Sequence, residues 1–223
     1  MIPWVQLDTA SVPDGGGELR LMQRGGEFSI MAGSTELMNS RLSGSEEALA
    51  TLACARIEGR SKPAILIGGL GMGFTLRAAL SVLGPEAEVT VAELVPAVVR
   101  WARGPLSALY GSSLDDPRTT VAEGDVGPIV TSARSAFDAI LLDVDNGPAG
   151  LTRAFNDGLY GARGLQDARA ALTPGGVLAV WSSAPDAGFT RRLRTAGFDV
   201  EEVGVRARGK RGARHVIWLA TRI

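Results

Sequence analysis

The sequence offers little sulfur or imidazole chemistry. Its 223 residues include one cysteine and one histidine, so an internal disulfide is excluded and a Cys/His metal cluster has too few ligands. Lys and Arg number 23 against 24 Asp and Glu, which leaves a net charge of -1. The chain therefore lacks the basic surplus of proteins that bind nucleic acid. We predict no metal site and no nucleic-acid partner.

Long hydrophobic runs are also missing. No apolar segment approaches the roughly 20 residues that a transmembrane helix needs. The segment before Leu21 lacks a basic stretch followed by an apolar one, the pattern of a signal peptide. These absences predict a cytoplasmic protein with no membrane partner.

Apolar segments instead alternate with helical patterns from Lys62 onward. Each run is apolar nearly throughout, which is typical of parallel strands buried on both faces of a sheet. Two further apolar segments near the C-terminus, joined by a basic turn, predict a closing antiparallel hairpin. The five runs that we expect to be parallel strands are 64–69, 88–94, 119–125, 137–145 and 176–183.

The residues before this region predict a smaller unit. Short strand-like segments flank the turn-forming stretch 11–18, a third such segment follows at 27–33, and together they indicate a small N-terminal β-hairpin. The segment 26–49 contains a polar loop that we expect to fold over a ligand as a lid. Residues 44–58 predict a helix with Ser45 as N-cap. We assign residues 1–60 to this N-terminal unit and 61–223 to a ligand-binding domain.

A glycine-rich loop, "GGLGMGF" (68–74), follows the first of the five runs and opens a helix. Such a loop lies where an open α/β sheet binds nucleotides. Phe74 stands where the dinucleotide fingerprint has its third glycine, so the loop is predicted to pack under a nucleoside with an amino-acid tail rather than under a pyrophosphate. The predicted cofactor-binding glycines are Gly68, Gly69, Gly71 and Gly73.

Acidic residues end the next strands. Glu93, followed by Leu94, ends the second run, where an acid takes two ribose hydroxyls in dinucleotide folds. Gly124 and Asp125 end the third, and the Asp125 side chain is predicted to accept a hydrogen bond from an adenine amino group. Asp143 and Asp145 lie at the end of the fourth run. Together these positions predict a bound adenosyl group.

The order of these motifs resembles the spermidine synthase-like (polyamine aminopropyltransferase) branch of the class I S-adenosylmethionine-dependent methyltransferases. The resemblance extends from about Glu18 to the C-terminus and rests on "ILIGGLGMGFTLR", "VTVAELVPAVV", "FDAILLDVDNGP" and "LTPGGVLAVW". It implies an α/β, Rossmann-like class I methyltransferase fold. We expect a mostly parallel seven-stranded sheet with a C-terminal antiparallel hairpin, beside a small N-terminal β-hairpin and helix. The resemblance also implies a possible homodimer.

The chain departs from the family pattern at the positions for the polyamine. The glycine loop lacks the Asp that grips the transferred amino group, Asn146 stands near the place of the second strand-end Asp, and no Tyr-His pair occurs in 39–49. We therefore predict an S-adenosylmethionine-dependent methyltransferase that acts on a small-molecule acceptor. The alternatives are an aminopropyltransferase that uses decarboxylated S-adenosylmethionine, or a non-catalytic nucleoside-binding module.

Two carboxylates are the catalytic candidates. Asp143 either accepts a proton from the acceptor or holds the ammonium of the cofactor tail, and the sequence leaves both roles open. Asp145 joins it or caps the turn.

The acceptor contacts are expected from loops around these carboxylates. Asn39 and Arg41, in the lid, are predicted to reach a carboxylate of the acceptor or of the methionine tail. The other predicted substrate contacts are Asn146, Asn156 and Tyr160.

Overall fold

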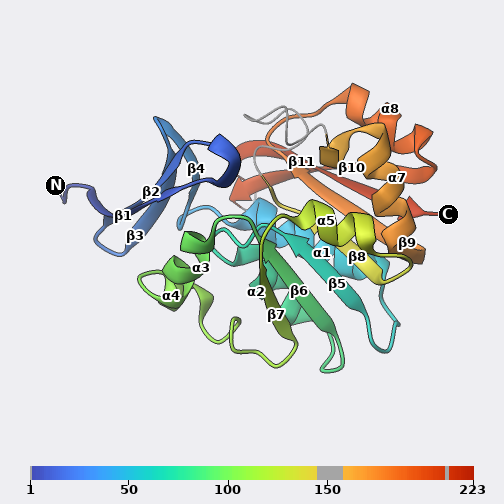
Figure 1. The fold of residues 1–223 in the computed structure, drawn as a ribbon, viewed down its shortest axis with the longest axis horizontal. Helices are drawn as coiled ribbons and strands as arrows, with labels where there is room; N and C mark the ends of the chain where they lie inside the picture. Colours follow the sequence, from blue (N-terminus) through green and yellow to red (C-terminus); the bar gives the residue numbers. More distant parts are fainter. Residues whose placement is uncertain (1, 145–157, 209–210) are drawn as a thin grey trace.

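The chain folds into a main α/β sheet with a smaller antiparallel sheet at its side (Figure 1). The structure is a computed structural model and describes residues 2–144, 158–208 and 211–223. The N-terminal sheet (blue) and the C-terminus lie toward opposite ends of the molecule in Figure 1. In the described part of the chain, no helix is long and apolar enough to cross a membrane.

The N-terminal unit is a four-stranded antiparallel meander, not the single hairpin that the sequence predicted. Its last two strands are residues 27–32 and 35–39, within the segment 26–49 that was predicted to contain a polar lid loop. Phe28 and Ile30 of the first of these strands are buried in the core, and the second strand pairs with it. The elements are β1 (Val5–Ser11), a short 3-10 helix η1 (Pro13–Gly15), β2 (Glu18–Arg24), β3 (Glu27–Ala32) and β4 (Thr35–Asn39).

The main sheet has seven strands in the order β10-β11-β9-β8-β5-β6-β7. The five strands from β5 to β9 are parallel, and β11 and β10 close the sheet as an antiparallel pair. The predicted fold class is thereby confirmed. The strands are β5 (Ala64–Gly68), β6 (Glu88–Glu93), β7 (Thr119–Glu123), β8 (Phe137–Leu142), β9 (Leu172–Ser182), β10 (Phe198–Arg208) and β11 (Arg211–Arg222).

Helices cover both faces of this sheet, and the alternation of side chains along each strand supplies both cores. On β5, Ile65 and Ile67 pack with α1, α2 and α3, whereas Leu66 packs with α5, α7 and α8 on the opposite face. The described helices are α1 (Gly44–Arg56), α2 (Phe74–Val82), α3 (Pro96–Arg103), α4 (Ser107–Tyr110), α5 (Val126–Ser132), α7 (Ala162–Ala171) and α8 (Ala187–Thr195).

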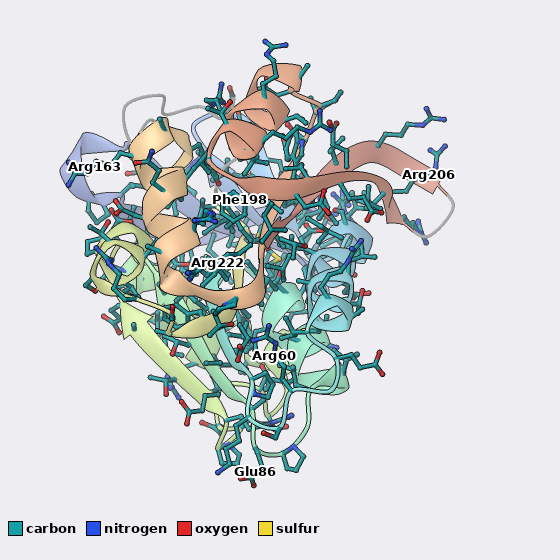
Figure 2. The ribbon with its side chains drawn as sticks, turned by 90° about the vertical axis from the view of Figure 1, so that its right-hand side faces the viewer. Arg60, Glu86, Arg163, Phe198, Arg206 and Arg222 are labelled. Carbon is teal, nitrogen blue, oxygen red and sulfur yellow. The ribbon has the colours of Figure 1, made fainter. Side chains whose placement is uncertain are left out.

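A buried carboxylate ties the amino ends of the central strands together. Asp138, near the start of β8, accepts hydrogen bonds from the Ala64 main-chain N at 2.8 Å and from Thr173 Oγ1 at 2.8 Å. It also forms an ion pair with Arg60. In Figure 2, Arg60 lies in the lower half of the molecule, toward Glu86 and away from the projecting β10–β11 ribbon that carries Arg206. This network therefore lies at the edge of the sheet opposite to the carboxyl ends of the strands.

Asp138→Ala is expected to lower the free energy of unfolding by about 2–4 kcal/mol, because it leaves a partly buried guanidinium and a main-chain N–H without their acceptor. Urea denaturation measures this change. The matched control is Asp115→Ala, whose carboxylate is 81% exposed and should change stability by less than about 0.5 kcal/mol. Equal effects of the two substitutions would contradict the role assigned to Asp138.

Candidate active site

A cavity of about 660 Å³ lies at the carboxyl ends of the parallel strands and extends to the N-terminal sheet. It is lined by residues that follow β5, β6, β7 and β8, by the start of α1, and by apolar side chains of the N-terminal sheet. Ligands of open α/β sheets bind at this edge, because the loops there diverge and leave a crevice. The described lining residues are Val12, Leu19, Ile30, Leu37, Met38, Glu46, Gly69, Gly71, Ala92, Glu93, Leu94, Val95, Val98, Gly124, Asp125, Val126, Gly127, Pro128, Thr131, Asp143, Val144, Gly158, Leu159 and Trp181.

The glycine loop forms the floor of the cavity. Gly69 has a φ of +93°, and a Cβ there would lie 2.4 Å from the main-chain oxygen of Asp143. A Cβ on Gly71 would lie 2.6 Å from Cε of Met38, a lining residue. Neither position can carry a side chain without displacing its neighbour, since real Cβ atoms do not approach other atoms so closely. The absence of side chains thus lets the main chain of Asp143 and the side chain of Met38 lie directly against the loop.

The other two predicted glycines support the loop from outside the cavity. Gly68 packs against Leu142 and Val126. Gly73 precedes α2 with a φ of +78°, and a Cβ on it would meet the ring of Tyr110 at 2.4 Å. Tyr110 donates a hydrogen bond from its hydroxyl to the main-chain oxygen of Gly71 at 2.6 Å. Gly68 and Gly73 therefore shape the loop, whereas Gly69 and Gly71 line the cavity.

Glu93 is a buried carboxylate at the end of β6. Its Oε2 accepts a hydrogen bond from the Leu70 main-chain N at 2.9 Å, and its Oε1 accepts one from the Val95 N at 2.9 Å. Burial raises the pKa of Glu93, and these main-chain donors oppose the rise. The hydrogen bonds fix the carboxylate against the glycine loop, with Leu94 beside it in the cavity lining.

Asp125 and Gly124 line the cavity at the end of β7. Asp125 is the N-cap of α5, and its Oδ1 accepts a hydrogen bond from the Gly127 main-chain N at 2.8 Å. Because the carboxylate has further lone pairs, this cap leaves it able to accept another hydrogen bond from a ligand. The two strand-end acids predicted for an adenosyl group are thus brought to one cavity.

Asp143 follows β8 and lies between the glycine loop and the start of α2. Its main-chain N donates to the Gly68 oxygen at 2.9 Å, and its Oδ2 accepts a hydrogen bond from Thr75 Oγ1 at 2.7 Å. Burial raises the pKa of Asp143 to about 7, the negative charge of Glu46 adds to the rise, and the Thr75 hydroxyl opposes it. A carboxylate with this pKa gains and loses a proton near neutral pH.

The predicted lid residues do not lie at the cavity. Asn39, at the end of β4, is buried, and its Oδ1 accepts a hydrogen bond from the Arg41 main-chain N at 3.0 Å. The Arg41 guanidinium instead forms ion pairs with Glu27 at 3.6 Å and Glu36 at 3.5 Å. Arg41 lies beyond the end of β4, and its two ion pairs hold the guanidinium against the acids of β3 and β4. The expectation that Arg41 reaches a ligand carboxylate is therefore corrected.

Tyr160 does not line the cavity either. Its ring is buried and packs edge-to-face on Phe189 with the centroids 5.5 Å apart, so it belongs to the core beneath α8. Three other predicted site residues, Asp145, Asn146 and Asn156, lie outside the described residues.

Several lining residues were not foreseen. Glu46 lies in the first turn of the helix predicted over 44–58, and Leu37 and Met38 lie in the segment 26–49 that was predicted to contain a polar lid loop. Trp181 of β9 also lies in the cavity wall. Thr75 could have been predicted from the sequence. It is the second residue of the helix that follows the glycine loop, and a hydroxyl there lies near Asp143 at the end of the neighbouring strand β8.

The cavity is acidic. Four carboxylates line it, from Glu46, Glu93, Asp125 and Asp143, and no Lys, Arg or His occurs among the lining residues that the structure describes. Such a set favours a cationic ligand, since a bound anion would face uncompensated like charge.

The chain is similar in sequence to curated polyamine aminopropyltransferases. Polyamine aminopropyltransferase 1 of Streptomyces coelicolor is 34% identical over 147 residues, which cover 62% of this chain and 27% of that protein. The polyamine aminopropyltransferase of Sulfolobus acidocaldarius is 31% identical over 125 residues, covering 54% of this chain and 39% of that protein. The matched region thus spans well under half the length of these curated relatives. No protein-family model matches the chain.

Solved structures with the same fold include two spermidine synthases. One, in complex with the transition state analogue AdoDATO, matches with a TM-score of 0.77 and 18% identity over 98% of this chain and 72% of that chain. The spermidine synthase from Thermotoga maritima matches with a TM-score of 0.74 and 17% identity over the same shares. Human methyltransferase-like protein 13 has a TM-score of 0.60 and 19% identity over 78% of this chain and 81% of that one. These likenesses establish the Rossmann-like methyltransferase fold.

The comparisons correct the function predicted from the sequence. The preference for a small-molecule methyltransferase is wrong, because the similar sequences are polyamine aminopropyltransferases and the most similar of these folds are spermidine synthases. They favour the alternative, aminopropyl transfer. The resemblance of the chain to the spermidine synthase-like branch is confirmed by sequence and fold together.

Proposed function

We propose that this chain transfers an aminopropyl group from decarboxylated S-adenosylmethionine to an amine acceptor. The acidic lining of the cavity carries the proposal. Both reactants are cations, and four carboxylates with no cationic side chain among the described lining residues match their charge. The sequence relatives act in the same class of reaction by their names.

The nucleoside half of the donor fits the β5–β7 side of the cavity. Gly69 and Gly71 line the cavity there and present main chain without side chains to a ligand. Glu93, fixed by two main-chain donors, keeps lone pairs for ribose hydroxyls, and Asp125 keeps lone pairs for an adenine amino group. The geometry suits an uncharged nucleoside, because a phosphate would meet two carboxylates.

The lining also favours a donor tail without a carboxylate. A methionine carboxylate needs a cation or free main-chain donors as partners. Arg41, the residue predicted for that role, pairs with Glu27 and Glu36 instead. A decarboxylated tail, which carries only an ammonium, avoids repulsion by Asp143 and Glu46.

Asp143 is the proposed proton acceptor. The donor supplies a methylene carbon made electrophilic by the adjacent sulfonium. The reacting ammonium of the acceptor first gives one proton to the Asp143 carboxylate, which has a pKa of about 7 and is held by Thr75. The lone pair of the resulting amine then forms a bond to that carbon, the bond from carbon to sulfur breaks, and its electron pair stays on sulfur in the thioether product. Most of the remaining rate enhancement would come from alignment of the reactants.

The wild-type chain is expected to bind decarboxylated S-adenosylmethionine roughly tenfold or more tightly than S-adenosylmethionine, because the extra carboxylate meets like charge. Calorimetric titration with both ligands measures this. Mass spectrometry of reactions with amines should then detect aminopropylated product and 5′-methylthioadenosine. Preference for the carboxylated ligand, or methyl transfer in place of aminopropyl transfer, would refute the proposal.

Glu93→Gln is expected to weaken binding of 5′-methylthioadenosine by about 1–3 kcal/mol, because one ribose acceptor is lost and the amide repels a main-chain N–H. The control is Glu123→Gln on β7, which pairs in register with Glu93 but is exposed. Its affinity should equal that of the wild type. Unchanged affinity in both variants would show that Glu93 does not bind the ribose.

Asp143→Asn tests the elevated pKa through stability. The pKa of Asp143 in the folded state, about 7, lies above the ordinary value of 3.8. The folded state therefore binds the Asp143 proton more tightly than the unfolded state does. This proton binding stabilises the fold fully below the ordinary pKa, and the stabilisation is lost as pH rises through 7. The wild type should lose stability between about pH 5 and about pH 8. The Asn variant should lose less, as urea midpoints at both pH values would show. Parallel losses would contradict the assigned pKa.

Turnover of the same variant tests the proton transfer. If Asp143 accepts the amine proton, aminopropyl transfer should fall by roughly 10²–10⁴-fold while nucleoside affinity stays within a few-fold.

A further inference from the structure

One lining carboxylate, Glu46, has no assigned partner on the acceptor, although its charge would repel a carboxylated donor tail. Glu46 lies in the first turn of α1 and lines the cavity, yet it is remote in sequence from the strand ends that carry Glu93, Asp125 and Asp143. Its neighbour Glu47 is exposed and lines a separate cavity of about 580 Å³ together with residues of α2. Two adjacent acids of one helix therefore face different surroundings.

A hydrogen-bonded chain holds Glu46 in place. Ser45 is completely buried, and its Oγ donates a hydrogen bond to Glu46 Oε2 at 2.6 Å. His215 Nδ1 lies 2.9 Å from the same Oγ. Because a hydroxyl has only one proton, Ser45 must accept from His215, which requires Nδ1 to carry a proton. Burial lowers the pKa of His215, and the negative charge of Glu46 opposes that effect.

The hydrogen bonds between Glu46, Ser45 and His215 place Glu46 on the acceptor side of Asp143. The order of the main sheet sets β5, β6 and β7, with their nucleoside-binding ends, on one side of β8, and β9 and β11 on the other. His215 belongs to β11, whose next residue, Val216, pairs with Ser182 at the end of β9. Because Ser45 is bonded to His215, the start of α1 and Glu46 lie toward β9 and β11. The donor nucleoside lies on the opposite side.

Trp181 gives this side an aromatic wall. It lines the cavity from β9, and its ring stands edge-to-face with that of His215 at 4.8 Å between the centroids. Its Nε1 is buried and finds no hydrogen-bond partner within the described part of the chain. An indole face beside a carboxylate suits an alkylammonium group, since both attract the charge and the ring covers the methylenes.

We propose that Glu46, positioned by Ser45 and His215, binds the second ammonium group of the acceptor and so selects diamines over monoamines. The proposal rests on the proposed aminopropyl transfer and adds the residue that determines the acceptor. Asp143 then faces the reacting amine, and Glu46 neutralises the charge at the other end. Glu46 of α1 thereby supplies the second acceptor-side carboxylate that the family pattern has near the position of Asn146.

Binding of 1,4-diaminobutane and 1-aminobutane in the presence of 5′-methylthioadenosine tests the proposal without turnover. The wild type should bind the diamine more tightly. Glu46→Gln should weaken diamine binding by roughly 10- to 100-fold and abolish the preference, because a charged hydrogen bond is lost. Glu47→Gln, the matched control on the same helix, should bind both amines like the wild type.

Ser45→Ala separates positioning from folding. It should weaken diamine binding roughly 3- to 10-fold and leave the affinity for 5′-methylthioadenosine unchanged. A role limited to folding would lower both affinities together and would overturn the positioning role of Ser45.

Other outcomes are equally decisive. Equal diamine affinity in the wild type and Glu46→Gln, or no diamine binding by the wild type, overturns the assignment of Glu46. A loss of affinity for decarboxylated S-adenosylmethionine instead of the diamine assigns Glu46 to the donor and also overturns it. Glu46-dependent diamine binding without any aminopropyl transfer by the wild type would refute the proposed function alone.

Discussion

The close approach of Gly69 to the main chain of Asp143 is the constraint on which the site depends. With no Cβ and a positive φ, Gly69 lets the loop after β5 lie directly against the chain that leaves β8. The contact brings Asp143 beside the start of α2, where Thr75 bonds its carboxylate. A side chain at Gly69 would separate the two segments and displace the carboxylate together with the floor of the cavity.

Concentrated negative charge is costly in the absence of a ligand. Burial and the nearby Glu46 raise the pKa of Asp143, and burial raises that of Glu93. The chain tolerates these carboxylates because each accepts hydrogen bonds from a main-chain N–H or a hydroxyl. A cationic ligand would relieve the remaining repulsion, so the same arrangement that reduces stability favours binding of sulfonium and ammonium groups.

The methyltransferase prediction failed because it counted acids only where the family motifs place them. By that count the chain has lost carboxylates at the glycine loop and near Asn146. The folded chain supplies Glu46 from a helix far away in sequence, and it engages Arg41 in ion pairs outside the cavity. Because of both facts, the part of the cavity that would hold the donor tail is more negative than the motifs predict. Neither follows from motif spacing, because each depends on how the N-terminal unit packs on the main sheet.

The sequence by itself determined the order of strands and helices, the glycine loop and the strand-end acids. These features are local: apolar runs, φ-permissive glycines and acids directly after strands all act within one βα unit, and parallel strands must meet at one edge. Tertiary structure alone decided that residues 35–39 form a fourth strand beside β3 and that Asn39 and Arg41 lie away from the cavity. It also decided that Ser45, Glu46 and His215 form one hydrogen-bonded chain. These contacts join segments as far as 170 positions apart, and only packing of the N-terminal sheet, α1 and the C-terminal hairpin against one another brings such segments together.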